Sequence, residues 1–259
     1  MDHHGTTALI TGASSGLGVD FAHQLAARGA DLVLVARRAD RLEELASTLR
    51  AQHGVQVRVL PADLTLPGAA ATLRAQLDGV HVDTLVNNAG FGHFGDLADT
   101  DPAVASGMVA LNVAALVDLT RTFLPDLLAG RGALVNIAST AAYQPCPHLA
   151  VYGATKAFVL SFTEALHAET RGSGLRVLAL SPGATRTEFF DIAGREAQVG
   201  RMQESADVVG LAMRALDRRR TPASIVSGRT NGLTAVASRL FPRRVTLAVS
   251  DRLMSPQSA

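Results

Sequence analysis

The sequence predicts an α/β fold in which about seven parallel strands form one doubly wound sheet with helices on both faces. Short runs rich in β-branched residues and leucine alternate with longer stretches of helical periodicity, which is the pattern of βαβ units. No fixed repeat and no low-complexity linker interrupts this alternation. Residues 1–259 therefore indicate a single domain, and only its C-terminal segment, 229–259, differs in composition.

Each expected strand is a short apolar run of the kind that a parallel sheet buries on both faces. The seven runs are Thr6–Thr11, Asp31–Ala36, Val55–Pro61, Val82–Asn87, Ala133–Ala138, Leu175–Ser181 and Ala223–Ser227. The stretches between them favour helices. In Asp40–Gln52, for example, Leu42, Leu45 and Leu49 fall on one helical face. Sheets of this kind bind ligands at the carboxyl ends of their strands.

The composition excludes several classes of protein. The net charge of +1 and the lack of basic stretches interleaved with aromatic residues argue against a nucleic-acid partner. A single cysteine, Cys146, rules out an internal disulfide and a multi-cysteine zinc site, which fits a reducing compartment. The chain shows neither a secretory signal nor an obvious transmembrane run. We therefore expect a cytoplasmic protein.

The C-terminal segment 229–259 is basic and amphipathic. Five arginines and one aspartate alternate with apolar residues there, and Pro242 interrupts any continuous helix. The favoured interpretation is that the segment packs on the domain or on a neighbouring subunit. Contact with an anionic membrane surface is the alternative.

A glycine-rich turn follows the first expected strand and leads into an amphipathic helix. Its spacing is GxxxGxG, and glycines at such a turn let the backbone approach a pyrophosphate while the helix N-terminus offers free amides. The residues expected to hold the phosphates are Gly12, Ser14, Ser15, Gly16, Leu17 and Gly18. The fold is therefore expected to be a Rossmann-type dinucleotide-binding sheet.

Further motifs appear in a fixed order along the chain: Asn87-Asn88-Ala89-Gly90, Asn112, Ser139, Tyr152, Lys156 and Pro182-Gly183. Together with the glycine turn they resemble the short-chain dehydrogenase/reductase family, and within it the NADP-preferring bacterial carbonyl reductases. The resemblance extends from Thr6 to about Gly228. It implies an oxidoreductase that binds a nicotinamide dinucleotide and assembles as a homodimer or homotetramer.

The residues after the second expected strand predict a preference for NADP(H) over NAD(H). An acidic residue there would bind both ribose hydroxyls, but this chain has Ala36 followed by Arg37 and Arg38, and guanidinium groups suit a 2′-phosphate. The resemblance points to Arg37 as the firmer contact and to Ser14 as a helper. Alternatively, one of the two arginines only begins a solvated helix and does not bind the phosphate.

The resemblance places other residues around the cofactor. Asp63 and Leu64 match positions that contact adenine, although a helix cap is the structural alternative for Asp63. The remaining matches are Asn88, Ala89 and Gly90 after the fourth strand, Tyr152 and Lys156 beside the ribose, and Pro182, Gly183 and Thr185 near the nicotinamide.

Lys156 is the only lysine among 24 basic residues, and it follows Tyr152 by four positions. On a helix these two side chains share a face, so the ammonium can stabilise the phenolate of a tyrosine that would otherwise be a reluctant base. Ser139 ends a strand, where its hydroxyl can hydrogen-bond a substrate oxygen. The resemblance implies that Asn112 holds a water linking Lys156 to solvent. These four residues form the expected catalytic set, which needs no metal.

Three loops are expected to frame the substrate: Phe91–Asp101, Thr140–Val151 and Ala184–Ser205. Their apolar side chains favour a hydrophobic carbonyl or alcohol as the small-molecule partner. These side chains are Phe91, Phe94, Tyr143, Leu149, Phe189, Phe190 and Met202. Two alternatives to an active enzyme are a catalytically silent NADP(H)-binding sensor or scaffold, and a peripheral membrane protein acting through its C-terminal segment.

Overall fold

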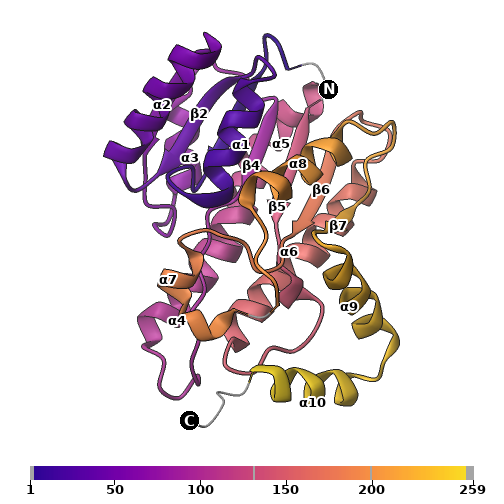
Figure 1. The fold of residues 1–259 in the computed structure, drawn as a ribbon. Helices are drawn as coiled ribbons and strands as arrows, with labels where there is room; N and C mark the ends of the chain where they lie inside the picture. The colour runs from indigo at the N-terminus through magenta and orange to yellow at the C-terminus, as the bar shows by residue number, and fades with distance from the viewer. Residues whose placement is uncertain (1–2, 131, 199, 255–259) are drawn as a thin grey trace.

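A computed structural model describes residues 3–130, 132–198 and 200–254. Seven strands form one fully parallel sheet in the order β3-β2-β1-β4-β5-β6-β7 (Figure 1). The strands are β1 (Thr7–Thr11), β2 (Asp31–Ala36), β3 (Val57–Pro61), β4 (Thr84–Asn87), β5 (Ala133–Ile137), β6 (Arg176–Ser181) and β7 (Ser224–Val226). Each lies inside an apolar run that the sequence predicted, so the predicted fold class is confirmed.

Helices cover both faces of the sheet, and α1, α2, α3, α5, α6 and α8 each carry apolar side chains toward it. Their bounds are α1 (Gly16–Ala26), α2 (Ala39–His53), α3 (Ala69–Gln76), α4 (Pro102–Val109), α5 (Leu116–Ala129), α6 (Ala150–Glu169), α7 (Phe189–Ala193), α8 (Ser205–Leu216), α9 (Arg229–Leu240) and α10 (Arg243–Met254). One core layer joins α1, α2 and α8 to the sheet, and the other joins α3, α5 and α6 to the opposite face.

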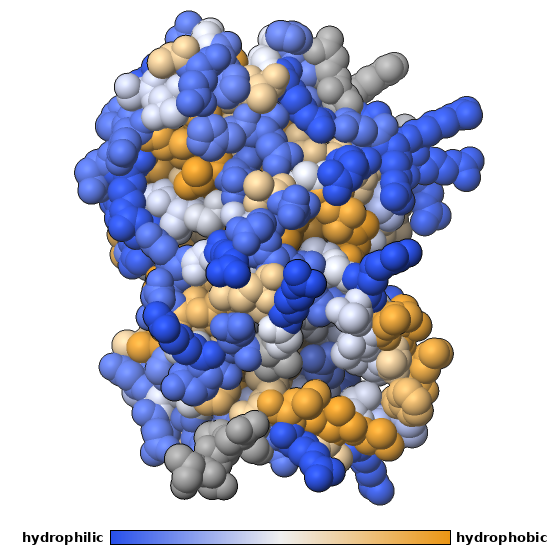
Figure 2. Space-filling model, in the orientation of Figure 1, coloured by the Kyte–Doolittle hydropathy of each residue, from blue (hydrophilic) through white to orange (hydrophobic). Residues whose placement is uncertain are grey.

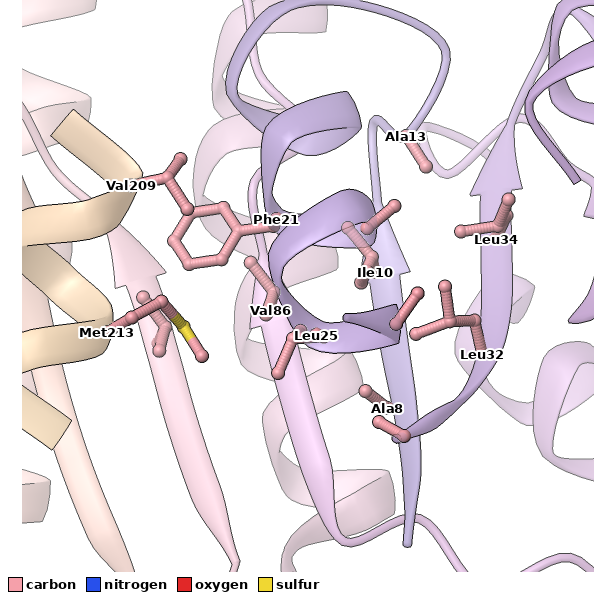
Figure 3. Close-up of a cluster of buried hydrophobic side chains, with 14 of the residues drawn as sticks. Ala8, Ile10, Ala13, Phe21, Leu25, Leu32, Leu34, Val86, Val209 and Met213 are labelled. Atoms are coloured by element: carbon pink, nitrogen blue, oxygen red, sulfur yellow. The ribbon is translucent and has the colours of Figure 1, made fainter. Parts of the chain in front are cut away.

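Phe21 of α1 shows how the first layer is packed. It is fully buried and points toward Val209 and Met213 of α8, while Ile10 and Val86 from the sheet lie beneath (Figure 3). Burying such side chains contributes about 1.5–3 kcal/mol each. This packing fixes α1, and therefore the glycine turn before it, against β1.

One helical run, Pro102–Ala129, is long and apolar enough to cross a membrane by length and composition alone. It consists of α4, a π-helical segment at Ala110–Ala115 and α5. The core helix of a soluble protein passes the same test, and here Leu119, Phe123 and Leu127 are buried against the sheet. The run therefore gives little support to a membrane span.

The C-terminal segment forms two helices that extend away from the sheet (Figure 1). Pro242 separates α9 from α10, as the sequence predicted. Of α10, only Ser250 and Met254 are buried. The sequence predicted that this segment packs on the domain or on a neighbouring subunit. Most of its large apolar side chains are exposed and so do not pack on the domain, while packing on a neighbouring subunit stays a prediction. Residues 255–259 lie outside the described part of the chain.

Candidate active site

The glycine turn lies where the strand order reverses, between β1 and β4, which is where doubly wound sheets bind ligands. Gly12 adopts φ +65°, and a Cβ there would lie 2.8 Å from Nδ2 of Asn88. Gly16 adopts φ +52°, and a Cβ there would lie 2.7 Å from Cγ2 of Thr187. The turn therefore requires glycine for both its conformation and its close contacts.

Asn88 holds the glycine turn against the end of β4. Its Nδ2 donates to the carbonyl oxygens of Thr11 (2.9 Å) and Gly12 (3.1 Å). The backbone amides of Asn88 and Ala89 both donate to the Thr11 hydroxyl at 3.0 Å. Thr11 was not among the predicted site residues, because its role depends on a contact with a strand far along the chain.

The N-terminus of α1 is open toward the same space. Ser15 precedes the helix in an extended conformation, and among the described residues no side chain caps the first turn and no acidic residue lies in it. Unpaired amides and the helix dipole at such an end attract an anion. The turn thus fits the pyrophosphate of a dinucleotide.

Arg38 connects the turn to the loop after β6. Its Nη2 lies 3.0 Å from Oγ of Ser14, and its Nη1 lies 2.8 Å from Oε2 of Glu188. Arg41 pairs with the other oxygen of Glu188. The two guanidinium groups lower the pKa of Glu188 through hydrogen bonds and charge. Glu188 was missed by the sequence analysis, since nothing local marks it as a partner of Arg38.

Arg37 is exposed and lies near Asp63, whose pKa it helps to lower. The larger cause is Thr65, whose amide (2.9 Å) and hydroxyl (2.7 Å) both donate to Oδ1 of Asp63. Asp63 therefore stabilises a local turn and lines the cavity, whereas the helix cap given as its structural alternative is wrong, because α3 begins at Ala69 with Gly68 at its N-cap.

These elements enclose a cavity of about 570 Å³, which is within the range of small-molecule sites. Most of the predicted cofactor residues line it: Gly12, Ser14, Ser15, Gly16, Leu17, Arg37, Arg38, Asp63, Leu64, Asn88, Ala89, Gly90, Tyr152, Lys156, Pro182, Gly183 and Thr185. Gly18 is not in this lining. A Cβ on it would lie 2.3 Å from the Gly12 carbonyl oxygen, so Gly18 serves the packing of the turn.

Tyr152, Lys156 and Ser139 meet in the wall of this cavity. Tyr152 and Lys156 lie one turn apart on α6, and Nζ of Lys156 is 5.8 Å from the centre of the tyrosine ring. Nζ donates to the carbonyl oxygen of Ile137, at the end of β5, at 2.8 Å. Ser139 follows β5, and its hydroxyl lies close enough to Tyr152 to lower the pKa of the phenol. The sheet and α6 thus hold all three groups on regular elements.

Burial perturbs both titratable groups. Tyr152 is 8% exposed and Lys156 6% exposed. Desolvation raises the pKa of Tyr152 to about 12, although the hydrogen bond from Ser139 opposes that shift. Desolvation lowers the pKa of Lys156 to about 8. The first proton that this pair loses as the pH rises therefore comes from the lysine.

Asn112 lies behind the cavity wall, in the π-helical segment Ala110–Ala115. Its amide exchanges two hydrogen bonds with the backbone of Phe91, at 3.1 and 2.9 Å, and donates to Thr155 at 3.0 Å. A Cβ on Gly90 would lie 2.9 Å from Oδ1 of Asn112 and 3.4 Å from Nζ of Lys156. Because Gly90 has no side chain, the side chains of Asn112 and Lys156 can both lie close to its backbone. The water that would link Lys156 to solvent through Asn112 stays a prediction.

All three predicted loops contribute apolar walls to the remaining part of the cavity. Phe91, Leu149, Phe189 and Phe190 line it, and the rings of Tyr152 and Phe189 are 5.3 Å apart. Three other predicted residues, Phe94, Tyr143 and Met202, are not in the lining. Tyr143 instead lies 3.3 Å from the Ser181 hydroxyl and beneath the guanidinium of Arg239.

Met254, at the end of α10, also lines the cavity. It packs with Met108, Leu149 and Tyr152 in one buried cluster. Sequence analysis missed it because about a hundred residues separate it from Tyr152. The position of Met254 in an amphipathic segment does not by itself indicate that the residue lines the cavity.

The histidines do not form a metal site. Within residues 3–130, 132–198 and 200–254, no group of three or more histidine, cysteine or acidic side chains is arranged to hold a metal ion. Nδ1 of His148 instead lies 2.6 Å from Asp96, which ties together two of the loops that frame the cavity. The cavity wall carries the phenol of Tyr152, the ammonium of Lys156 and the hydroxyl of Ser139.

Similarity to known proteins covers most of the chain. The family model for the short chain dehydrogenase matches residues 6–197. A very-long-chain 3-oxoacyl-CoA reductase from Anas platyrhynchos is 34% identical over 196 residues, which are 73% of this chain and 62% of the relative. The chain thus spans only about three fifths of the length of that relative.

Solved structures extend the similarity to nearly the whole chain. A short-chain dehydrogenase from Sphingobium yanoikuyae, in complex with NADPH, has a TM-score of 0.80 and 36% identity, covering 91% of this chain and 94% of its own. A 3-ketoacyl-(acyl-carrier-protein) reductase from Brucella melitensis, complexed with NADH, has a TM-score of 0.76 and 30% identity, covering 87% and 98%. With the family model matched over most of its strands and helices, the chain belongs to the short-chain dehydrogenase family of oxidoreductases.

Proposed function

We propose that the protein is an NADP(H)-dependent oxidoreductase that interconverts a carbonyl and an alcohol on an apolar small molecule. The observation that carries this proposal is the buried meeting of Tyr152, Lys156 and Ser139 in the wall of the cavity that the glycine turn also lines. A catalytically silent sensor or scaffold would be expected to lack at least one of these three groups, and the chain has them all.

A bound reduced nicotinamide would supply the hydride that adds to the carbonyl carbon. The Tyr152 hydroxyl donates its proton to the carbonyl oxygen, while Ser139 donates a hydrogen bond to the same oxygen as negative charge develops there. The Lys156 ammonium stabilises the phenolate until a proton from solvent restores it. In alcohol oxidation Tyr152 accepts the proton. The raised pKa of Tyr152 suits the acid role, because the phenol stays protonated well above neutral pH.

The preference for NADP(H) is supported by the positive charge at the end of β2. Arg38 lies against Ser14 of the phosphate-binding turn, and Arg37 lies beside it at the cavity edge. A guanidinium beside a hydroxyl can bind a phosphate through charge-assisted hydrogen bonds. The similar structure that contains NADPH supports this assignment. Another similar structure contains NADH, so the cofactor preference of this chain must be tested directly.

An apolar substrate is supported by the walls beyond Tyr152. Phe91, Leu149, Phe189 and Met254 offer hydrocarbon surface there. The similarity to a very-long-chain 3-oxoacyl-CoA reductase points the same way. A cytoplasmic location and assembly as a homodimer or homotetramer remain parts of the proposal, and light scattering tests the assembly.

Turnover on a panel of ketones and aldehydes tests the proposal. Consumption of NADPH, followed by absorbance, is expected to be fastest with the more apolar carbonyls. Tyr152→Phe is expected to lower turnover by about a hundredfold or more while NADPH affinity changes little, because the phenol acts on the substrate oxygen. A Tyr152→Phe protein with unchanged turnover would refute the proton-transfer assignment.

Matched variants test the cofactor preference. Arg38→Ala is expected to weaken NADPH binding by about tenfold or more while NADH binding changes little, since only NADPH carries the 2′-phosphate. Arg37→Ala serves as the comparison and shows how the two arginines share this role. Equal losses for NADPH and NADH in both variants would contradict the 2′-phosphate assignment.

A further inference from the structure

The outer faces of α9 and α10 carry most of the large apolar side chains that the fold leaves exposed. Eight of the fourteen such side chains in the described part of the chain lie here: Leu233, Val236, Leu240, Phe241, Val245, Leu247, Val249 and Leu253. Leu240 is 78% exposed and Leu253 65% exposed. Figure 2 shows hydrophobic residues along α10 and at its corner with α9. We call seven of these residues the apolar face and leave out Leu247, which helical spacing places on the opposite side of α10 from Val245 and Val249.

The polarity of α10 is reversed relative to an ordinary surface helix. Thr246, Ser250 and Met254 lie one turn apart and point toward the domain, whereas Val245, Val249 and Leu253 form the next stripe and are exposed. A helix that served only to cover its own domain would turn the valine and leucine stripe inward. The apolar face is therefore built to contact something outside the domain.

Basic side chains border this stripe. Arg244, Ala248 and Arg252 follow one another at the same spacing and share a shallow groove with Val245, Val249 and Leu253. The ion pairs of the described residues leave Arg244 and Arg252 unpaired. Across residues 229–254 five arginines stand against one aspartate. A partner surface must therefore present apolar groups next to negative charge.

We propose that α9 and α10 dock the protein on an anionic phospholipid surface, with the apolar face inserted among the acyl chains and Arg244 and Arg252 on the headgroup phosphates. Helices with valine and leucine on one stripe and arginines on the next lie in such interfaces. A second copy of the chain fits less well. A two-fold contact through this face would bring Arg244 and Arg252 close to their own copies, without enough acidic residues on α10 to neutralise them. This proposal does not depend on the enzymatic one.

Vesicle sedimentation of the full chain tests the proposal. Vesicles of phosphatidylcholine with phosphatidylglycerol are expected to bind the protein, vesicles of phosphatidylcholine alone are expected to bind it much more weakly, and salt well above about 0.15 M is expected to weaken binding to the anionic vesicles. Arg244→Gln/Arg252→Gln should reduce partition about twenty-five-fold, since each basic residue near an anionic surface contributes about fivefold. Val249→Glu/Leu253→Glu should reduce it by about tenfold or more. All four positions are exposed, so these variants should keep their far-ultraviolet circular dichroism.

The matched control is Arg219→Gln/Arg220→Gln, which removes two exposed arginines outside this segment and should leave partition nearly unchanged. Equal losses in the control, or equal binding to neutral and anionic vesicles, would overturn the proposal. It would also be overturned if Val249→Glu/Leu253→Glu lowered the mass measured by light scattering without changing vesicle binding. In that case a second copy covers the apolar face.

Discussion

Lys156→Met is expected to raise the free energy of unfolding at pH 7 and to lose most of that gain by pH 10. Lys156 is almost fully buried, and the fold lowers its pKa from 10.5 to about 8. One pKa unit corresponds to about 1.4 kcal/mol, so holding the ammonium in the fold costs about 3 kcal/mol at pH 7. Removing the hydrogen bond to Ile137 offsets about 1 kcal/mol of this. The expected net gain is about 2 kcal/mol.

The pH dependence follows from the sign of the shift. Between pH 8 and 10.5 the unfolded chain binds the lysine proton and the folded chain does not, so the parent gains stability as the pH rises. Methionine has no such dependence. By pH 10 the cost of the lysine is below about 1 kcal/mol, and the advantage of the variant should shrink by about 2 kcal/mol.

Urea unfolding of both proteins at pH 7 and pH 10, followed by circular dichroism, measures this difference. Other groups titrate alike in the two proteins and cancel. Arg171→Met, which removes an exposed cation from the loop after α6, is the control and should change stability little at either pH. A difference between Lys156→Met and the parent that is the same at both pH values would show that the ammonium is not desolvated, and the electrostatic account of the site would fail.

Three further outcomes are expected. The rate of carbonyl reduction should be nearly constant below pH 7 and should fall above about pH 8 as Lys156 loses its proton. Lys156→Arg, whatever its absolute rate, should lack this fall. A parent rate that is flat to pH 10 would contradict the role of the ammonium. Glu188→Gln should strengthen NADPH binding about fivefold in a fluorescence titration and leave the affinity for NADH unchanged, because the carboxylate competes with the 2′-phosphate for Arg38. Weaker NADPH binding would show that Glu188 orients Arg38 instead. Gly18→Ala should lower the unfolding free energy by about 2–4 kcal/mol, since the added methyl group would overlap the Gly12 carbonyl. Gly232→Ala, in open space on α9, should instead stabilise the protein by about 1 kcal/mol or less. Equal effects of the two variants in urea unfolding would reject the steric argument.

Much of this site could be predicted from the sequence because its chemistry is encoded locally. The glycine turn follows its strand directly, and Tyr152 and Lys156 lie one helical turn apart, so short spacing alone brings them together. Ser139 ends a strand whose apolar pattern is clear, and parallel strands end at the same edge of the sheet.

The missed contacts all join distant parts of the chain. Glu188 reaches Arg38, and Met254 joins the buried cluster that contains Tyr152, only after the sheet has assembled. The inward stripe of α10 also could not be foreseen, because amphipathic periodicity gives a helix two faces and does not say which of them meets the protein. Tyr143 illustrates the reverse error: a loop aromatic near the site packs elsewhere.

The reversed helix α10 also has a consequence for motion. Since its apolar stripe faces away from the domain, little hydrophobic burial holds it in place, and Met254 is its main anchor. Its amides should exchange with deuterium long before those of β1 or β4. Each such opening removes one wall from the cavity beside Tyr152. The central strands of the sheet should therefore open last, whereas an opening of α10 changes the part of the cavity wall that Met254 forms.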